Sequence, residues 1–201
     1  MAADAHRLIT PALLEWSAYS AEAKCTLTSH AWSHQGKVVL VDPVATGAAA
    51  TGALQQLGSV VLIIATNANH DRDIRQWRQL LQVPVAASAH AVKGLGFKPD
   101  VILESCPILQ GLKPIALEGG APGEHALHSA EQKLLIVGDA LVHLPETGLA
   151  PLPDKYCSDP ARLRASLAAL ARLDFETLAF AHGEAIATGA RARVQEALAR
   201  H

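Results

Sequence analysis

The sequence has few aromatic residues and almost no net charge, and it has no long hydrophobic run. Aromatic residues make up 4% of its 201 residues, and the formal net charge at pH 7 is −2. Because no block of five or six like charges occurs, we expect no nucleic-acid or membrane-surface partner. The longest unbroken apolar run, residues 60–65, is far shorter than the roughly 20 residues of a membrane-spanning helix.

Cysteine is also scarce, and its spacing excludes common cysteine-based sites. Cys25, Cys106 and Cys157 are odd in number and far apart, and no Cys-x-x-Cys pair occurs. This pattern predicts free thiols in a reducing compartment. The first seven residues lack the basic and apolar segments of a secretory leader, so we expect a cytoplasmic protein.

What the sequence has is enough apolar material for a folded core. Half of the residues are hydrophobic and 18% are charged, which excludes intrinsic disorder. A chain of this length fits one domain of about 150–200 residues. We therefore expect residues 1–201 to form a single domain.

Short apolar runs alternate with amphipathic segments along the chain. The runs that predict buried strands are 37–41, 60–65, 83–86, 133–137 and 176–180. Their Val, Ile and Leu content without polar alternation is typical of strands covered on both faces. More mixed runs that predict hairpin strands are 24–29, 100–104 and 114–117, and helical patterns cover 46–57, 72–81, 159–170 and 185–200. Residues 144–153 are predicted to be a loop, and two sheets with helices outside would account for the whole pattern.

Polar residues follow four of the buried runs directly. Asp42, the segment 66–73, Asp139 and His182 each come just after such a run. Ligands of α/β sheets bind at the carboxyl ends of strands. We therefore expect these four groups to meet at one edge and form a site.

The order of these motifs resembles the metallo-β-lactamase superfamily from about residue 24 to the end. The motifs are TNANHDRD at 66–73, EGGAPGEH at 118–125, IVGDAL at 136–141 and AFAHGE at 179–184. The resemblance implies an α/β fold, an αββα sandwich of two mixed sheets with helices outside. It also implies a metal-dependent hydrolase with one or two metal ions at the sheet edge.

Several metal ligands that the resemblance calls for are replaced in this sequence. The family loop His-x-His-x-Asp-His is here Asn67 to Arg72, and a further ligand position falls on Gly120. These changes remove the ligands of one metal. The resemblance leaves Asp71, Asp139 and His182 for a second metal, and this set would accept zinc, manganese or iron. The implied site therefore holds at most one metal, and His125 or His128 is an alternative source of a ligand.

Arg72 supports an alternative without any metal. A guanidinium group cannot coordinate a metal, but it can neutralise carboxylates. On this interpretation Arg72 contacts Asp71 or Asp139, directly or through one water, and supplies the positive charge that the metals supply elsewhere.

The functional alternatives follow from these two interpretations. With one metal, Asp71, Asp139 and His70 would act in catalysis on a small ester or thioester. Without a metal, the protein is a pseudoenzyme relative that binds a small anionic or polar ligand. In both cases Asn67, Asn69 and Arg72 are the predicted substrate-binding residues. A third alternative is a body that mainly supports oligomerisation.

Overall fold

A seven-stranded mixed sheet forms the first half of the molecule in the computed structural model, which describes residues 6–200. Its strands run in spatial order β1 to β7: β1 (His6–Thr10), β2 (Leu13–Ser20), β3 (Cys25–His34), β4 (Lys37–Val41), β5 (Ser59–Ala65), β6 (Val85–Ala87) and β7 (Val101–Ile102). The pairs from β1 to β4 are antiparallel, and those from β4 to β7 are parallel.

A four-stranded sheet forms the second half, in the order β13-β10-β9-β8. Its members are β8 (Lys113–Ala116), β9 (His125–Ser129), β10 (Leu134–Val137) and β13 (Thr177–Phe180). Only β10 and β13 are parallel to each other. A separate hairpin of β11 (Leu141–Leu144) and β12 (Gly148–Pro151) follows the first strand of that parallel pair.

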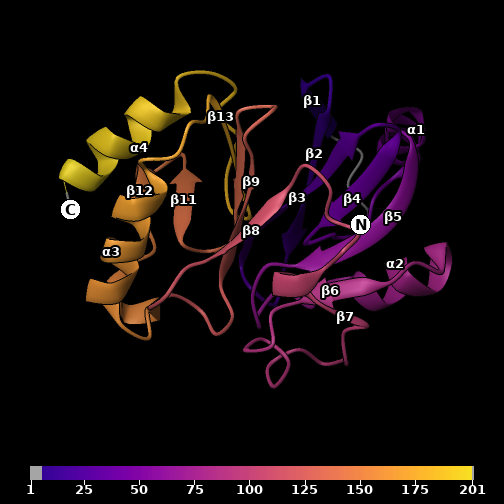
Figure 1. Cartoon of the computed structure of the whole chain (residues 1–201), viewed down its shortest axis with the longest axis horizontal. Helices are drawn as coiled ribbons and strands as arrows, with labels where there is room; N and C mark the ends of the chain where they lie inside the picture. Colours follow the sequence, from indigo (N-terminus) through magenta and orange to yellow (C-terminus); the bar gives the residue numbers. More distant parts are fainter. Residues whose placement is uncertain (1–5, 201) are drawn as a thin grey trace.

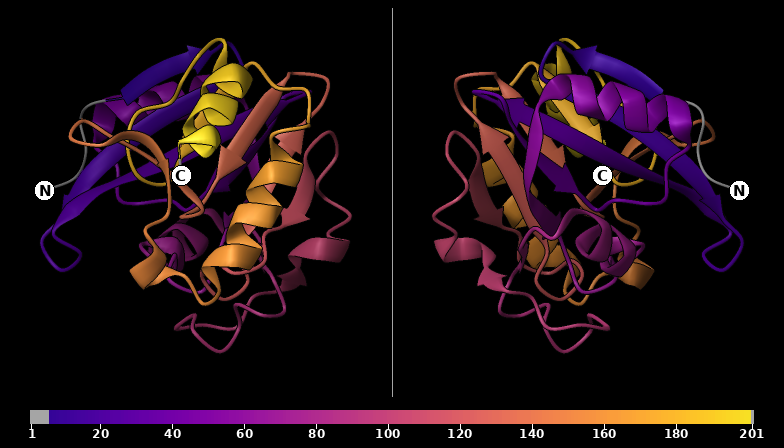
Figure 2. Two further views of the ribbon diagram at one scale, coloured as in Figure 1. Left: turned by 90° about the vertical axis from the view of Figure 1, so that its left-hand side faces the viewer. Right: turned by 90° about the vertical axis from the view of Figure 1, so that its right-hand side faces the viewer.

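Helices cover the outer face of each sheet (Figure 1). The helices α1 (Ala48–Leu57) and α2 (Ile74–Leu81) lie on the seven-stranded sheet, and α3 (Pro160–Leu170) and α4 (Ala190–Ala199) lie on the side of the second sheet. Views from the two ends show one helix pair on each side (Figure 2). Two short 3₁₀ segments, η1 (Leu103–Ser105) and η2 (Asp154–Tyr156), complete the elements. The predicted αββα sandwich is confirmed.

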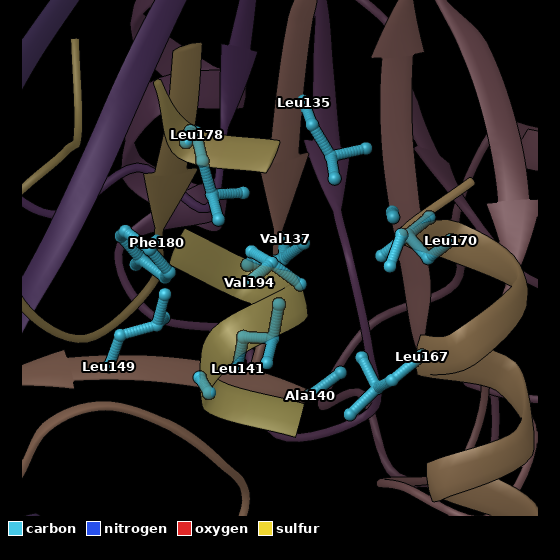
Figure 3. Close-up of a cluster of buried hydrophobic side chains, with 14 of the residues drawn as sticks. Leu135, Val137, Ala140, Leu141, Leu149, Leu167, Leu170, Leu178, Phe180 and Val194 are labelled. Carbon is cyan, nitrogen blue, oxygen red and sulfur yellow. The ribbon is translucent and has the colours of Figure 1, made fainter. Parts of the chain in front are cut away.

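Apolar side chains fill all three spaces between these four layers. In β5, Ile63 belongs to the core under α1 and α2, whereas Leu62 and Ile64 belong to the core between the sheets. Successive side chains of a strand point to opposite faces, which explains why the central strands are continuously apolar. The third core packs Leu167 and Val194, with neighbouring residues, against the second sheet (Figure 3).

The helix α3 begins where the sequence predicts it. The Asp159 carboxylate accepts hydrogen bonds from the backbone N–H groups of Ala161 and Arg162, both at 3.1 Å, and Pro160 occupies the first turn. Such a cap stabilises a helix by about 1 kcal/mol.

Other boundaries differ from the expectations. The predicted loop 144–153 contains β12, because Gly148 has a positive φ of 68° and closes a tight turn after β11. The helix predicted from residue 72 begins at Ile74, since Arg72 has a φ of 33°. The helix predicted over 185–200 begins only after Gly189, whose φ is 66°. No helix within residues 6–200 has the length and hydropathy needed to cross a bilayer.

Candidate functional site

The site lies at the carboxyl ends of β4, β5, β10 and β13. Asp42 follows β4 directly, His70 lies in the loop after β5, and Asp139 and His182 follow β10 and β13 by two residues. The two sheets face each other here, so each sheet supplies part of one cluster.

Carboxylates and imidazoles alternate through this cluster. His70 Nδ1 lies 2.9 Å from Asp42 Oδ2, and His70 Nε2 lies 3.0 Å from Asp139 Oδ1. The same Asp139 oxygen lies 3.1 Å from His182 Nε2. Both ring nitrogens of His70 therefore face a carboxylate.

The electrostatics of the cluster favour a charged His70. Burial opposes this charge, but the carboxylates of Asp139 and Asp42 outweigh it and raise the pKa of His70 to about 9. Burial would raise the pKa of Asp42, yet His70, Arg72 and the Thr66 hydrogen bond together lower it. The pKa of Asp139 is likewise held well below its usual value, because His70 and His182 outweigh its burial. At neutral pH the cluster therefore combines two carboxylates with an imidazolium.

Arg72 binds backbone carbonyls rather than the predicted carboxylates. Its Nη1 donates to the carbonyl oxygens of Thr28 at 2.7 Å and Asp42 at 2.9 Å, and its Nη2 donates to that of Ala181 at 3.3 Å. The ion pairs of the described residues include none between Arg72 and Asp71 or Asp139, which corrects the expectation of a direct contact. The physical reason is the turn at Arg72, whose φ of 33° directs the side chain toward β3 and the end of β13. Its charge still acts on the cluster by lowering the pKa of Asp42.

Asn67 joins Asp139 to a buried carboxyl group, that of Glu124. The Asn67 Nδ2 donates to Glu124 Oε2 at 2.8 Å and to Asp139 Oδ2 at 3.1 Å. Burial and the nearby charge of Asp139 raise the pKa of Glu124 to about 8. Sequence reasoning missed Glu124, although it lies in the motif 118–125 and precedes a predicted alternative ligand. Asn67 is fully buried and so lies behind the cavity, whereas Asn69 is exposed at its rim.

The group that could hold a metal differs from the predicted one by one residue. Ligand atoms of His70, Asp139 and His182 all lie within 4.8 Å of one another. The predicted ligand Asp71 is exposed and is not part of this group. The alternative ligands lie elsewhere, because His125 Nδ1 is 2.9 Å from the Gly123 carbonyl and His128 Nε2 is 2.9 Å from the Asp174 carbonyl.

A cavity of about 820 Å³ opens beside the cluster. Its walls include Tyr19 and Leu27 from the first two long strands, Asn69 and Arg72 from the loop, and Asp139 and His182 from the second sheet. This volume lies within the range of small-molecule sites, about 300–1,000 Å³.

The backbone at Val44 forms another part of the cavity wall. The indole N–H groups of Trp16 and Trp77 both donate to the Val44 carbonyl oxygen, each at 3.0 Å. Asp73 accepts a hydrogen bond from the backbone N–H of the next residue, Ala45, at 2.7 Å. These bonds fix the loop after β4 against α2.

The sequence model of the metallo-beta-lactamase superfamily matches residues 5–200 of this chain. Solved metallo-beta-lactamases share its fold. DIM-1 has a TM-score of 0.77 at 12% identity over 100% of this chain and 98% of its own. FIM-1 from Pseudomonas aeruginosa, in its mono-zinc form, has a TM-score of 0.75 at 13% identity over 100% of this chain and 96% of its own.

An enzyme from Erythrobacter litoralis, with beta mercaptoethanol in its active site, has a TM-score of 0.75 at 15% identity over 98% of this chain and 96% of its own. At these identities the likeness concerns the fold alone. No curated protein matches this chain.

Proposed function

Because the chain belongs to the metallo-β-lactamase superfamily over residues 5–200, we propose that it retains a cavity at the sheet edge and binds a small polar molecule there without a metal ion. One observation carries this proposal. His70 lies between Asp42 and Asp139. One of its ring nitrogens is 2.9 Å from the Asp42 carboxylate, and the other is 3.0 Å from the Asp139 carboxylate. An imidazolium in this place supplies positive charge where the family would use a metal.

The donor set does not fit a metal ion. A protonated imidazole has no lone pair to coordinate with, and the pKa of His70 is raised to about 9. A metal at His70 Nε2 would have to displace one ring proton and the contact with Asp139, while Nδ1–H could keep its bond to Asp42. The guanidinium of Arg72 also lies 3.4 Å from His70 Nε2, and it would repel a divalent cation.

Charge balance supports the same conclusion. The carboxylates of Asp42 and Asp139 are matched by the two cations His70 and Arg72. A buried cluster of charges is stable only when it is paired and hydrogen-bonded. A divalent cation that displaces the His70 proton would still add one net positive charge to a cluster that is already neutral.

The cavity favours a polar ligand over an anion. The terminal nitrogens of Arg72 already donate to backbone carbonyls, so the guanidinium has little capacity left for an anion. The exposed polar groups at the rim include the hydroxyl of Tyr19, the amide of Asn69 and the carboxylates of Glu22 and Asp71. These groups suit a small molecule that both donates and accepts hydrogen bonds.

Metal content and ligand retention test the two parts of the proposal. Elemental analysis of protein purified without chelator, followed by calorimetric titration with zinc, should detect no bound zinc. Native mass spectrometry should show a small molecule that wild type retains and that is lost in Leu27→Trp, whose larger side chain narrows the cavity. One or two zinc ions per chain would overturn the metal-free site, and equal retention by the two proteins would overturn the ligand site.

A metal-dependent hydrolase with a single metal is the second candidate. It is favoured by the proximity of His70, Asp139 and His182 within 4.8 Å. It requires that His70 lose the proton on Nε2, so that this nitrogen and the Asp139 carboxylate bind the metal instead of each other. The zinc titration separates the two candidates, since only this one predicts a stoichiometry of one metal ion per chain.

A further inference from the structure

A cysteine thiol lies on the other side of His182. Cys25 Sγ is 3.8 Å from His182 Nδ1, and His182 Nε2 is 3.1 Å from Asp139 Oδ1. We propose that Cys25, His182 and Asp139 form a nucleophilic site that cleaves small acyl esters or thioesters without a metal. The proposal rests on the metal-free site proposed above, since a metal would occupy His182 and Asp139.

The fold holds the thiol and the imidazole together across two sheets. The backbone N–H of Thr28 donates to the Ala181 carbonyl at 2.9 Å, and its hydroxyl donates to the Gly183 carbonyl at 3.3 Å. These bonds fix the beginning of β3 against the residues that flank His182. These contacts between β3 and the end of β13 keep Cys25 close to His182. Regular elements hold catalytic groups more precisely than loops do.

The hydrogen bond to Asp139 gives His182 the orientation of a general base. A neutral His182 that donates from Nε2 to Asp139 keeps its lone pair on Nδ1, and Nδ1 faces the thiol. The thiolate is the nucleophilic form of a cysteine, so a thiol needs an adjacent base to react at neutral pH. A thiol, an imidazole that accepts its proton and a carboxylate that orients the imidazole are the parts of a nucleophilic triad.

Cys25 lies next to residues that line the cavity, although it is not itself part of the lining. Cys25 and Leu27 are two residues apart in β3, so their side chains point to the same face. Leu27 and His182 both line the cavity, and Cys25 is half-buried. By contrast, the thiol of Cys157 donates to the carbonyls of Leu152 and Pro153 at 3.5 and 3.6 Å, and it provides an internal comparison.

The reaction balances with water as the only co-reactant. The Cys25 thiol gives its proton to His182 Nδ1, and its sulfur attacks the carbonyl carbon of the substrate. The bond from that carbon to the leaving oxygen or sulfur breaks, and the leaving group takes the proton from His182. Water then cleaves the acyl-cysteine thioester, which releases a carboxylic acid and restores the thiol.

Acylation by p-nitrophenyl acetate in the presence of a chelator tests the inference. Peptide mass spectrometry should find one acetyl group on Cys25, and p-nitrophenol should appear in a burst of about one equivalent per chain. The burst should vanish in Cys25→Ser and persist in Cys157→Ser. A metal-free protein that shows no acetyl group on Cys25, or a Cys25→Ser variant as active as wild type, would overturn the inference.

His182→Gln tests the role of the imidazole. Loss of a general base typically lowers a rate by about 10²-fold or more, so acylation of Cys25 should slow by about this factor. Alkylation by iodoacetamide should also be faster at Cys25 than at Cys157 in wild type, and this difference should disappear in His182→Gln. Circular dichroism checks that the variant is folded, and unchanged acylation in a folded variant would contradict the role of His182.

The experiment separates this inference from the proposed function. Metal content is measured in the same samples, before the chelator is added. Zinc bound at one ion per chain overturns the metal-free site. Absence of Cys25 acylation in protein without metal overturns only the nucleophilic site.

Discussion

The two sheets contribute to the site through different kinds of backbone. On the first sheet, Asp42 and Arg72 have positive φ angles of 48° and 33°, and neither residue is a glycine. On the second sheet, Asp139 and His182 follow their strands without a positive φ. Non-glycine residues in the left-handed region are strained, and such strain persists only where the surroundings fix it.

The two sheets also differ in how closely their site residues match the family motif. The second sheet supplies Asp139 and His182, which the resemblance assigns as ligands, whereas the loop of the first sheet has asparagines and Arg72 where the resemblance implies histidines. The first sheet also supplies both cations, His70 and Arg72. In the function that we propose, this loop supplies positive charge where the family motif would coordinate a metal.

The largest expected effect comes from removing the cation between the sheets. His70→Ala leaves Asp42 and Asp139 without their shared partner, and stranding a buried charge costs about 3–5 kcal/mol of the free energy of unfolding. Urea denaturation measures this loss. The control is Asn69→Ala at an exposed position, whose free energy of unfolding should stay within about 0.5 kcal/mol of wild type. Equal stability of the two variants would contradict the role of His70.

Alkaline pH should weaken the same contact more gradually. The folded-state pKa of His70, about 9, lies above its unfolded value of 6.5. Its contribution is therefore complete below pH 6.5 and is lost as the pH rises through about 9, with a slope of at most ~1.4 kcal/mol per pH unit. Denaturation midpoints measured between these values should fall, and His70→Gln should flatten the decline. A decline of the same steepness in His70→Gln would assign it to another group.

Removing the second cation should have a somewhat smaller effect. Arg72→Met loses the hydrogen bonds to the carbonyls of Thr28, Asp42 and Ala181. Hydrogen bonds of a charged donor contribute about 1.5–3 kcal/mol each at most, and we expect a net loss of about 2–3 kcal/mol. The exposed Arg75 gives the matched control Arg75→Met. If both variants unfold at the same urea concentration, Arg72 does not hold the sheets together.

The smallest expected effect comes from a substitution at Gly138, next to Asp139 on the second sheet. A Cβ at Gly138 would lie 2.5 Å from Glu124 Oε1 and 2.6 Å from Thr66 Oγ1. Gly138→Ala should therefore destabilise the protein by about 1–2 kcal/mol through overpacking. Gly52→Ala, in α1 with no atom within 4 Å of the new Cβ, should instead stabilise it by about 0.5–1 kcal/mol. A thermal shift of the same sign in both variants would contradict this account.

The strand pattern predicted most of the fold and the meeting of Asp42, Asp139 and His182. Strands buried on both faces are continuously apolar, and their ends are marked by the first polar residue. The strands β1, β2, β9 and β11 escaped prediction because each mixes polar with apolar residues. The 101–102 strand is short because the chain turns into η1 at Leu103.

The loop after β5 could not be predicted at the level of side chains. The motif assigns the inward position to Asp71, but the structure directs His70 inward and leaves Asp71 exposed. Which of two adjacent side chains faces the site depends on the backbone angles of the turn, and the left-handed conformation of Arg72 is not encoded by hydrophobic periodicity. The burial of Glu124 beneath Asn67 depends on the packing of two sheets, which no local pattern describes.

The two indoles that share the Val44 carbonyl give the cavity an optical readout. The rings of Trp16 and Trp77 lie 6.3 Å apart between centroids, close enough to exchange excitation energy. Both are anchored to a carbonyl of the cavity wall, so a molecule that shifts Val44 alters the surroundings of two emitters together. Their common emission would then report occupancy without any added label.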